Sequence, residues 1–213
     1  VPAMALALIV GGCGVHDQGK EQMPLVPGTQ AVDAALQDVL PSYADGSLGS
    51  LDHEALNRVK AGTPINYWTL WSYEPSKGTA FDQMTQVRGG VTVPMLLDGE
   101  VCGSFSMGYE NGEWGTSGAG GTEAAQIERA SDLIRAALGA HAEVRAVVGP
   151  YNVWVMGHLG AREAAVFWDR TSMYAAAQWD DMSKLPQDFV VYSGDQLQSY
   201  LDAIGTAGEP VGK

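Results

Sequence analysis

The sequence has little positive charge and almost no cysteine. Only 12 of its 213 residues are Lys or Arg, against 25 Asp and Glu, so the formal net charge is −13. No cluster of Lys and Arg reverses this charge locally. A field of this sign repels phosphate backbones and anionic lipid surfaces. We therefore expect no nucleic-acid partner.

Long apolar runs are also missing. The continuous apolar segment ahead of the body of the chain, Ala3–Val10, spans about 12 Å as a helix, against about 30 Å for the hydrocarbon core of a bilayer. It is too short to cross a membrane but has the length of the apolar centre of a signal peptide. After Cys13 the sequence GVHDQGKEQMPLVPGTQ is polar, rich in Gly and Pro, and without periodicity, which is typical of a tether.

The motif VGGC at residues 10–13 resembles the lipobox of bacterial lipoproteins, in which an aliphatic residue and two small residues precede a lipidated cysteine. The resemblance implies that Cys13 carries the lipid and is the first residue of the mature chain. Residues 1–12 are then a signal-peptide remnant and residues 13–29 a flexible tether. The membrane is reached through the N-terminal lipid, so the location is extracytoplasmic, at the cell envelope. The alternative is a buried N-terminal strand or helix, with Cys13 in the core or in a disulfide.

The second cysteine, Cys102, lies in VCGSFSMGY. Strand alternation places it on the face opposite Phe105 and Met107. We expect a small buried residue, since no sequence signature lowers the pKa of this thiol. A catalytic thiol and a disulfide with Cys13 are the alternatives.

Helices and strands alternate in runs along the rest of the chain. Apolar spacing and capping residues predict helices over residues 29–41, 50–62, 122–139 and 193–205. Residues 64–75 are β-branched and aromatic and predict a strand, whereas residues 76–90 have the composition of a long loop. Asp98-Gly99 and Asn111-Gly112 predict type I′ turns that connect three antiparallel strands. Pro94 should mark an edge or a bulge in the first of them.

Three short strands are expected within residues 143–169, before the last helix. This pattern predicts an α+β fold, with an antiparallel sheet of roughly six to eight strands and helices packed on it. No repeat and no internal linker divides the chain, so we expect a single domain over residues 30–205, followed by a disordered tail over residues 206–213.

Motifs that carry chemistry are scarce. HEALN at residues 53–57 lacks the second histidine of the HExxH zinc motif, because Asn57 stands in its place. The glycine-rich GTSGAGGTEAAQ fits neither phosphate-binding fingerprint. No G-x-S-x-G motif is present. We therefore expect no metal and no cofactor.

The aromatic residues are the best candidates for a ligand surface. Trp68, Trp71 and Tyr73 lie close together, and Trp154 belongs to a later strand. Such residues usually fill cores, but in an open concavity they stack on sugars or peptides.

Two functions follow from these observations. The first is a lipid-anchored binding or accessory module for a small ligand, a glycan or a cell-envelope protein. The second is an exported hydrolase that uses Cys102 or a Ser with His141 or His158. The sequence does not indicate an oligomeric state.

Overall fold

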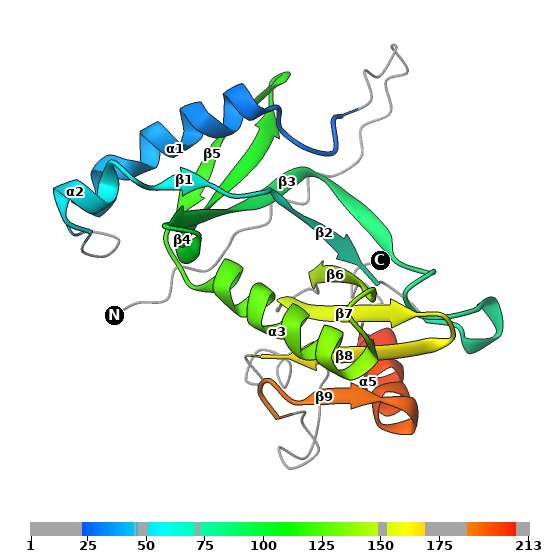
Figure 1. The fold of residues 1–213 in the computed structure, drawn as a ribbon. Coiled ribbons are helices and arrows are strands. Elements are labelled where there is room, and N and C mark those ends of the chain that lie inside the picture. Colours follow the sequence, from blue (N-terminus) through cyan, green and yellow to red (C-terminus); the bar gives the residue numbers. More distant parts are fainter. Residues whose placement is uncertain are drawn as a thin grey trace.

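The computed structural model describes residues 23–44, 46, 51–70, 73–148, 153–168 and 187–207, and a mixed sheet of nine strands forms its centre (Figure 1). The strands are β1 (Lys60–Ala61), β2 (Ile65–Thr69), β3 (Thr85–Leu97), β4 (Glu100–Glu110), β5 (Glu113–Ala119), β6 (Glu143–Val148), β7 (Val153–Leu159), β8 (Arg162–Phe167) and β9 (Val191–Ser193). The helices are α1 (Thr29–Ala44), α2 (His53–Leu56), α3 (Glu123–Leu138), α5 (Gly194–Ala207) and the short 3-10 helix η1 (Pro75–Lys77). The predicted α+β fold is therefore confirmed.

The strand order is β5-β4-β3-β2-β6-β7-β8-β9, with β1 beside β3. Two antiparallel ladders, β2 to β5 and β6 to β9, meet where β2 pairs with β6. That pair is parallel, whereas the other strand pairs are antiparallel. The sheet thus has nine strands instead of the expected six to eight. It also has one parallel pair, because α3 carries the chain back across the sheet before β6 begins.

Helices cover both sides of the sheet. On β7 and β8, Met156 and Phe167 pack in one cluster with α5, and Val155 and Val166 pack in another with α3. Neighbouring residues of a strand point to opposite faces, so α5 and α3 lie on opposite sides. The face under α1 and α5 is called the first face below, and the face under α3 the second face. In the described part of the chain no helix is long and apolar enough to cross a membrane.

The two hairpin turns form as predicted. Asp98 and Gly99 have φ values of 55° and 95°, and Asn111 and Gly112 have 54° and 91°. Both central residues of each turn are thus left-handed, as type I′ requires.

Pro94 lies inside the sheet, opposite a break in the neighbouring strand. β1 ends at Ala61 and β2 begins at Ile65, and the Pro94 carbonyl accepts a hydrogen bond from the Gly62 N–H at 2.8 Å. On the other side the register with β4 shifts right after Met95. The extra residue of this bulge, Cys102, belongs to β4, so the bulge is not in the strand of Pro94 as predicted. The proline is tolerated because regular pairing with β1 and β2 is interrupted beside it.

Several predicted boundaries were wrong. The first helix does not stop at Pro41 but continues to Ala44, because Tyr43 in the last turn is 3% exposed and packs in the core. The second helix is a single turn capped by Asp52, and the chain then forms β1 rather than more helix. The expected cap, Ser50, lies outside the described residues.

The predicted strand over residues 64–75 ends at Thr69, and the predicted loop over residues 76–90 ends when β3 begins at Thr85. The last helix continues to Ala207, into the expected tail, while residues 208–213 lie outside the described part. Residues 1–22, which hold the lipobox-like motif and most of the expected tether, lie outside it as well. The third helix was predicted correctly, with Thr122 before it and Gly139 after it.

Candidate functional site

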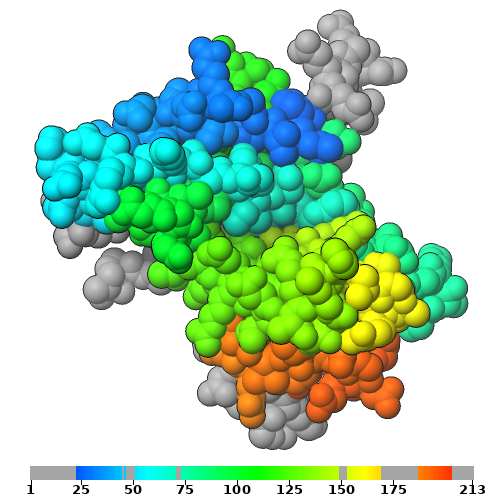
Figure 2. All heavy atoms as spheres, viewed as in Figure 1, coloured from blue at the N-terminus to red at the C-terminus, as the bar shows by residue number. Residues whose placement is uncertain are grey.

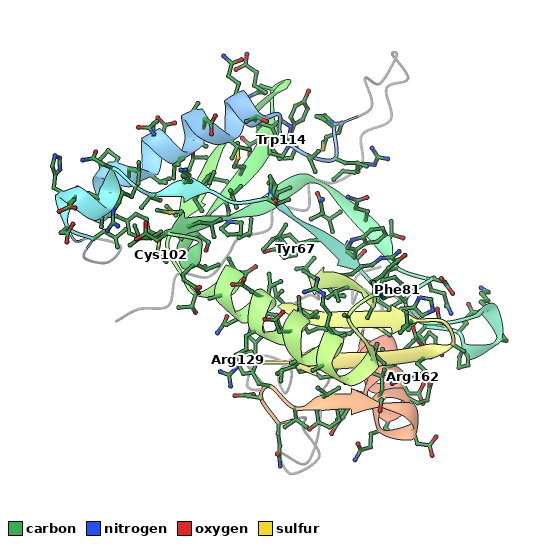
Figure 3. The ribbon with its side chains drawn as sticks, viewed as in Figure 1. Tyr67, Phe81, Cys102, Trp114, Arg129 and Arg162 are labelled. Carbon is green, nitrogen blue, oxygen red and sulfur yellow. The ribbon has the colours of Figure 1, made fainter. Side chains whose placement is uncertain are left out.

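The candidate site lies on the first face, where the segment Tyr73–Met84, called the strap below, folds over β6, β7 and β8. Its residues Ala80, Phe81 and Met84 are buried in the same cluster as the strand residues beneath them. The strap joins β2 to β3, and Figure 3 shows Phe81 near one end of the β6–β9 ladder. The strap therefore brings a loop from one ladder onto the other.

Three of the four predicted ligand residues converge on this cluster. Trp154 is part of its buried core, and Trp68 and Tyr73 are half-buried against it, as is Tyr200 of α5. Trp71 lies outside the described residues. The aromatic residues thus come together from β2, the strap, β7 and α5, which their separation in sequence does not reveal.

Trp154 is not available to a ligand in this structure. It is 1% exposed and stacks on Phe167, with ring centroids 5.1 Å apart. The aromatic side chains that pack against the same cluster and remain partly exposed are Trp68, Tyr73 and Tyr200, together called the aromatic surface below.

Arg145 of β6 lies between two aromatic rings. Its guanidinium carbon is 3.8 Å from the centroid of Trp68 and 3.7 Å from that of Phe81, and the same group donates a hydrogen bond to the Phe81 carbonyl. Burial lowers the pKa of Arg145, and the carboxylates of Glu143 and Asp82 oppose this shift. The cation–π contacts fix the orientation of the Trp68 ring at the edge of the site.

Glu163 of β8 holds the strap from the other side. Its carboxylate accepts hydrogen bonds from the backbone N–H groups of Phe81, at 2.7 Å, and of Ala80, at 3.3 Å. Because Ala80 and Phe81 are almost fully buried, these donors would otherwise have no access to water. Arg145 and Glu163 together satisfy both the carbonyl and the N–H of Phe81.

The two tyrosines at the site are neutral at physiological pH. Burial raises the pKa of Tyr73, and the carboxylates of Glu163 and Asp202 raise it further. Burial likewise raises the pKa of Tyr200, with a further contribution from Tyr192. Their phenol groups therefore serve as hydrogen-bond donors and acceptors rather than as anions.

Cys102 does not meet either histidine of the alternative hydrolase. Cys102 lies on β4 and His158 on β7, with β3, β2 and β6 between them, a separation of about 19 Å at ~4.8 Å per strand. His141 follows the C-terminal end of α3. The N-terminal end of that helix, about 24 Å away, is the end that contacts the ladder to which Cys102 belongs, so His141 is also remote from Cys102.

Cys102 sits at a β-bulge that sequence alternation did not predict. The register passes from Met95–Gly103 to Leu96–Val101, so Cys102 has no partner residue on β3. Its side chain packs against the cluster under α1, with Phe105 and Met107, and not on the opposite face as predicted. Burial raises the pKa of the thiol, whose sulfur lies 3.3 Å from the Met95 carbonyl oxygen. Cys13 lies outside the described residues.

A second polar cluster lies on the second face at the start of α3. The Tyr67 hydroxyl is hydrogen-bonded to the Thr92 hydroxyl at 2.7 Å and to the Glu123 carboxylate. Glu123 stands in the first turn of α3, directly after the glycine-rich sequence, so a carboxylate already occupies the end of the helix that favours anions. Within the described ranges no group of three or more His, Cys, Asp or Glu side chains is arranged to hold a metal ion.

No sequence motif pointed to Arg145, Glu163 or Phe81 as site residues. A usable signal was present in EVRAVV, because alternation places Arg145 on the same face as Val147, which is buried. A charged residue on an inward face needs partners. No family model matches the chain, and no match was found among the curated proteins or the solved structures.

Proposed function

We propose that this chain is a lipid-anchored extracytoplasmic binding module and that it meets its ligand at the aromatic surface of Trp68, Tyr73 and Tyr200. The observation that carries the proposal is the convergence of these half-buried rings on one buried cluster. Aromatic rings with polar tips stack on sugars and peptides while their phenol groups donate hydrogen bonds. The ligand is accordingly a glycan, a small molecule or a segment of a cell-envelope protein.

The anchor is the lipid on Cys13 that the lipobox resemblance implies. A domain held at a membrane by acyl chains needs no apolar membrane-contacting face of its own. Its high negative charge keeps it away from anionic headgroups. The module is thus presented to partners near the membrane without lying on it.

The anchor is tested by intact-mass analysis of the protein extracted from membranes of the producing cell. We expect a chain that begins at Cys13 and carries a diacylglyceryl group, and a C13S variant that fractionates as a soluble protein. An unmodified chain two hydrogens lighter than its reduced mass would instead place Cys13 and Cys102 in a disulfide and reject the anchor.

The binding surface is tested with soluble cell-wall glycan fragments and envelope extracts, using tryptophan fluorescence and calorimetry. We expect Y73A and W68A to weaken binding and Y109F, in the other ladder, to leave it unchanged. Binding that is equal in all three variants would reject this surface. Thermal unfolding of each variant separates a lost contact from a lost fold.

A further inference from the structure

β5 is the longer of the two strands at the ends of the sheet. It has seven residues and, in the described part of the chain, pairs on one side only, with β4, whereas β9 at the other end has three residues. An edge strand presents a row of N–H and C=O groups that have no partner in the sheet. These groups can pair with an extended segment of another protein, which then adds a strand.

Little in β5 blunts this edge. Proteins protect exposed edges with Pro or Lys, and the sequence EWGTSGA contains neither. Gly115, Thr116 and Ser117 are exposed, and a Cβ atom added at Gly115 or Gly118 would meet nothing within 4 Å apart from its chain neighbours. In Figure 2 green atoms of the β4–β5 hairpin reach the surface beside the blue atoms of α1, at the top of the view.

One irregularity limits how much of the edge can pair. The register with β4 passes from Met107–Thr116 to Ser106–Gly118, so Ser117 is an extra residue and forms a bulge. Bulges interrupt the regular spacing of the main-chain groups. The regular part of the edge is therefore Glu113–Thr116.

The charges beside this edge favour a cationic partner. Glu113 lies directly opposite Glu110 of β4, and like charges in this position repel each other. Both side chains are exposed, and within the described ranges no hydrogen bond or ion pair engages either carboxylate. The helix that packs over β5, α1, adds Asp33 and Asp38 and contains no Lys or Arg.

The side chains of β5 also leave room for a long basic residue. Trp114 packs with the cluster under α1, so Glu113 and Gly115 point to the second face. A Lys or Arg on a strand added beside β5, opposite Glu113, would face both Glu113 and Glu110 across the sheet. Gly115 has no side chain to obstruct the stem of such a residue.

We propose that the free edge of β5 binds an extended segment of a partner protein, with Lys or Arg at alternate positions, as an additional strand. Main-chain hydrogen bonds to Glu113–Thr116 hold the segment, and its basic side chains meet Glu113 and Glu110. A second copy of this chain is a poor occupant, because each copy carries a net charge of −13. The proposal does not rest on the aromatic surface, since β4 and β3 separate β5 from β2.

The test uses three capped peptides on the full chain carrying C13S. The first is Thr-Lys-Val-Lys-Val-Lys-Thr, the second has Glu in place of each Lys, and the third is the first peptide with N-methyl groups on the main-chain nitrogens of its five central residues. We expect saturable binding of the first peptide by NMR titration, with slowed amide exchange within Glu113–Thr116. The Glu peptide should bind about ten-fold more weakly because its charges are reversed, and the methylated peptide likewise because it lacks main-chain donors.

Variants of the protein test the position. E113Q should weaken binding of the Lys peptide about two- to five-fold, the size of an exposed cross-strand charge pair, and it removes a repulsion rather than a contact of the fold. E128Q, at an exposed glutamate of α3, is the matched control and should bind as the unmodified chain does. Y73A should also leave peptide binding unchanged, although it weakens binding at the aromatic surface.

The proposal is overturned if the Lys and Glu peptides bind equally, if the methylated peptide retains the affinity of the first, or if E113Q and E128Q behave alike. Slowed amide exchange outside β5 alone, or no saturable binding of the Lys peptide, would overturn it as well. A concentration-dependent dimer in analytical ultracentrifugation that protects the β5 amides would instead assign this edge to a second copy.

Discussion

The Glu163 carboxylate accepts a 2.7 Å hydrogen bond from the backbone N–H of Phe81, 82 residues earlier in the chain. This contact fixes the strap to β8 and holds Phe81 against Arg145. The strap, which carries Tyr73 of the aromatic surface, is therefore held partly by a carboxylate from the other ladder.

We predict that E163A lowers the free energy of unfolding by about 1–3 kcal/mol, the cost of leaving a buried backbone donor without an acceptor. E163Q should lose less, because its amide oxygen still accepts one hydrogen bond. Urea denaturation followed by fluorescence measures both. The matched control is E128A, at an exposed glutamate on α3, which should be close to neutral. Equal effects of E163A and E128A would contradict the role of Glu163.

Tyr67 should make the protein sensitive to alkali. Burial raises its pKa strongly, and the charge of Glu123 raises it further. The folded protein therefore keeps the proton when the unfolded chain has lost it, so stability is fully present below the ordinary tyrosine pKa of about 10 and falls as pH rises above it.

We expect Y67F to reduce this decline between about pH 9.5 and 11.5, around that ordinary value. At neutral pH, Y67F should cost about 1–3 kcal/mol, because Glu123 and Thr92 lose their partner. The measurement is the free energy of unfolding against pH. A Y109F profile, in which a phenol outside this cluster is removed, is the comparison. Identical slopes for Y67F and the unmodified chain would disprove the assignment.

Cys102 should be chemically inert in the folded protein. Burial raises the pKa of the thiol, so less of the reactive thiolate is present near neutral pH than for a free cysteine. In a C13S background we expect Ellman's reagent to modify Cys102 at least ten times more slowly than in urea-unfolded chain, a ratio set by access and thiolate fraction. Faster modification in the folded state would instead indicate an activated nucleophile.

At Gly157 on β7, α3 packs closely against the sheet. A Cβ atom added there would overlap the Ile134 side chain, which is fully buried, and would lie 3.3 Å from the Glu143 carbonyl oxygen. G157A should therefore destabilise the fold by about 1–3 kcal/mol through overpacking. G115A on β5, where nothing lies within 4 Å, is the matched control. If urea denaturation gave G157A the same free energy of unfolding as the unmodified chain, α3 would have moved away from β7 without loss of stability.

The features that were predicted correctly from the sequence depend only on residues that are neighbours in the chain. Asp98-Gly99 and Asn111-Gly112 specify their turns by themselves, and α3 carries its own apolar stripe, so neither depends on distant contacts. Within α3, Ala137 is exposed and Ser131 is buried, and the Ser131 hydroxyl donates to the Ile127 carbonyl at 2.7 Å.

The features that could not be predicted from the sequence depend on contacts between residues far apart in the chain. The parallel pairing of β2 with β6 depends on where α3 returns the chain, and the contacts of Phe81 with Arg145 and Glu163 join residues 64 and 82 positions apart. The amino-acid composition of a segment does not specify which distant residues it will pair with. The same holds for the bulge at Cys102, where residues 100–108 of β4 lie opposite residues 90–97 of β3.

The junction between β2 and β6 also bears on how the chain folds. The turns Asp98-Gly99 and Asn111-Gly112 join β3 to β5, and residues 160–161 join β7 to β8, so the pairing within these hairpins can form early from neighbouring segments. The junction instead joins Tyr67 to Ala146, 79 positions later, and it must wait until a long loop has closed. The two ladders are therefore expected to act as separate folding nuclei, with docking of β6 onto β2 as the late and slow step.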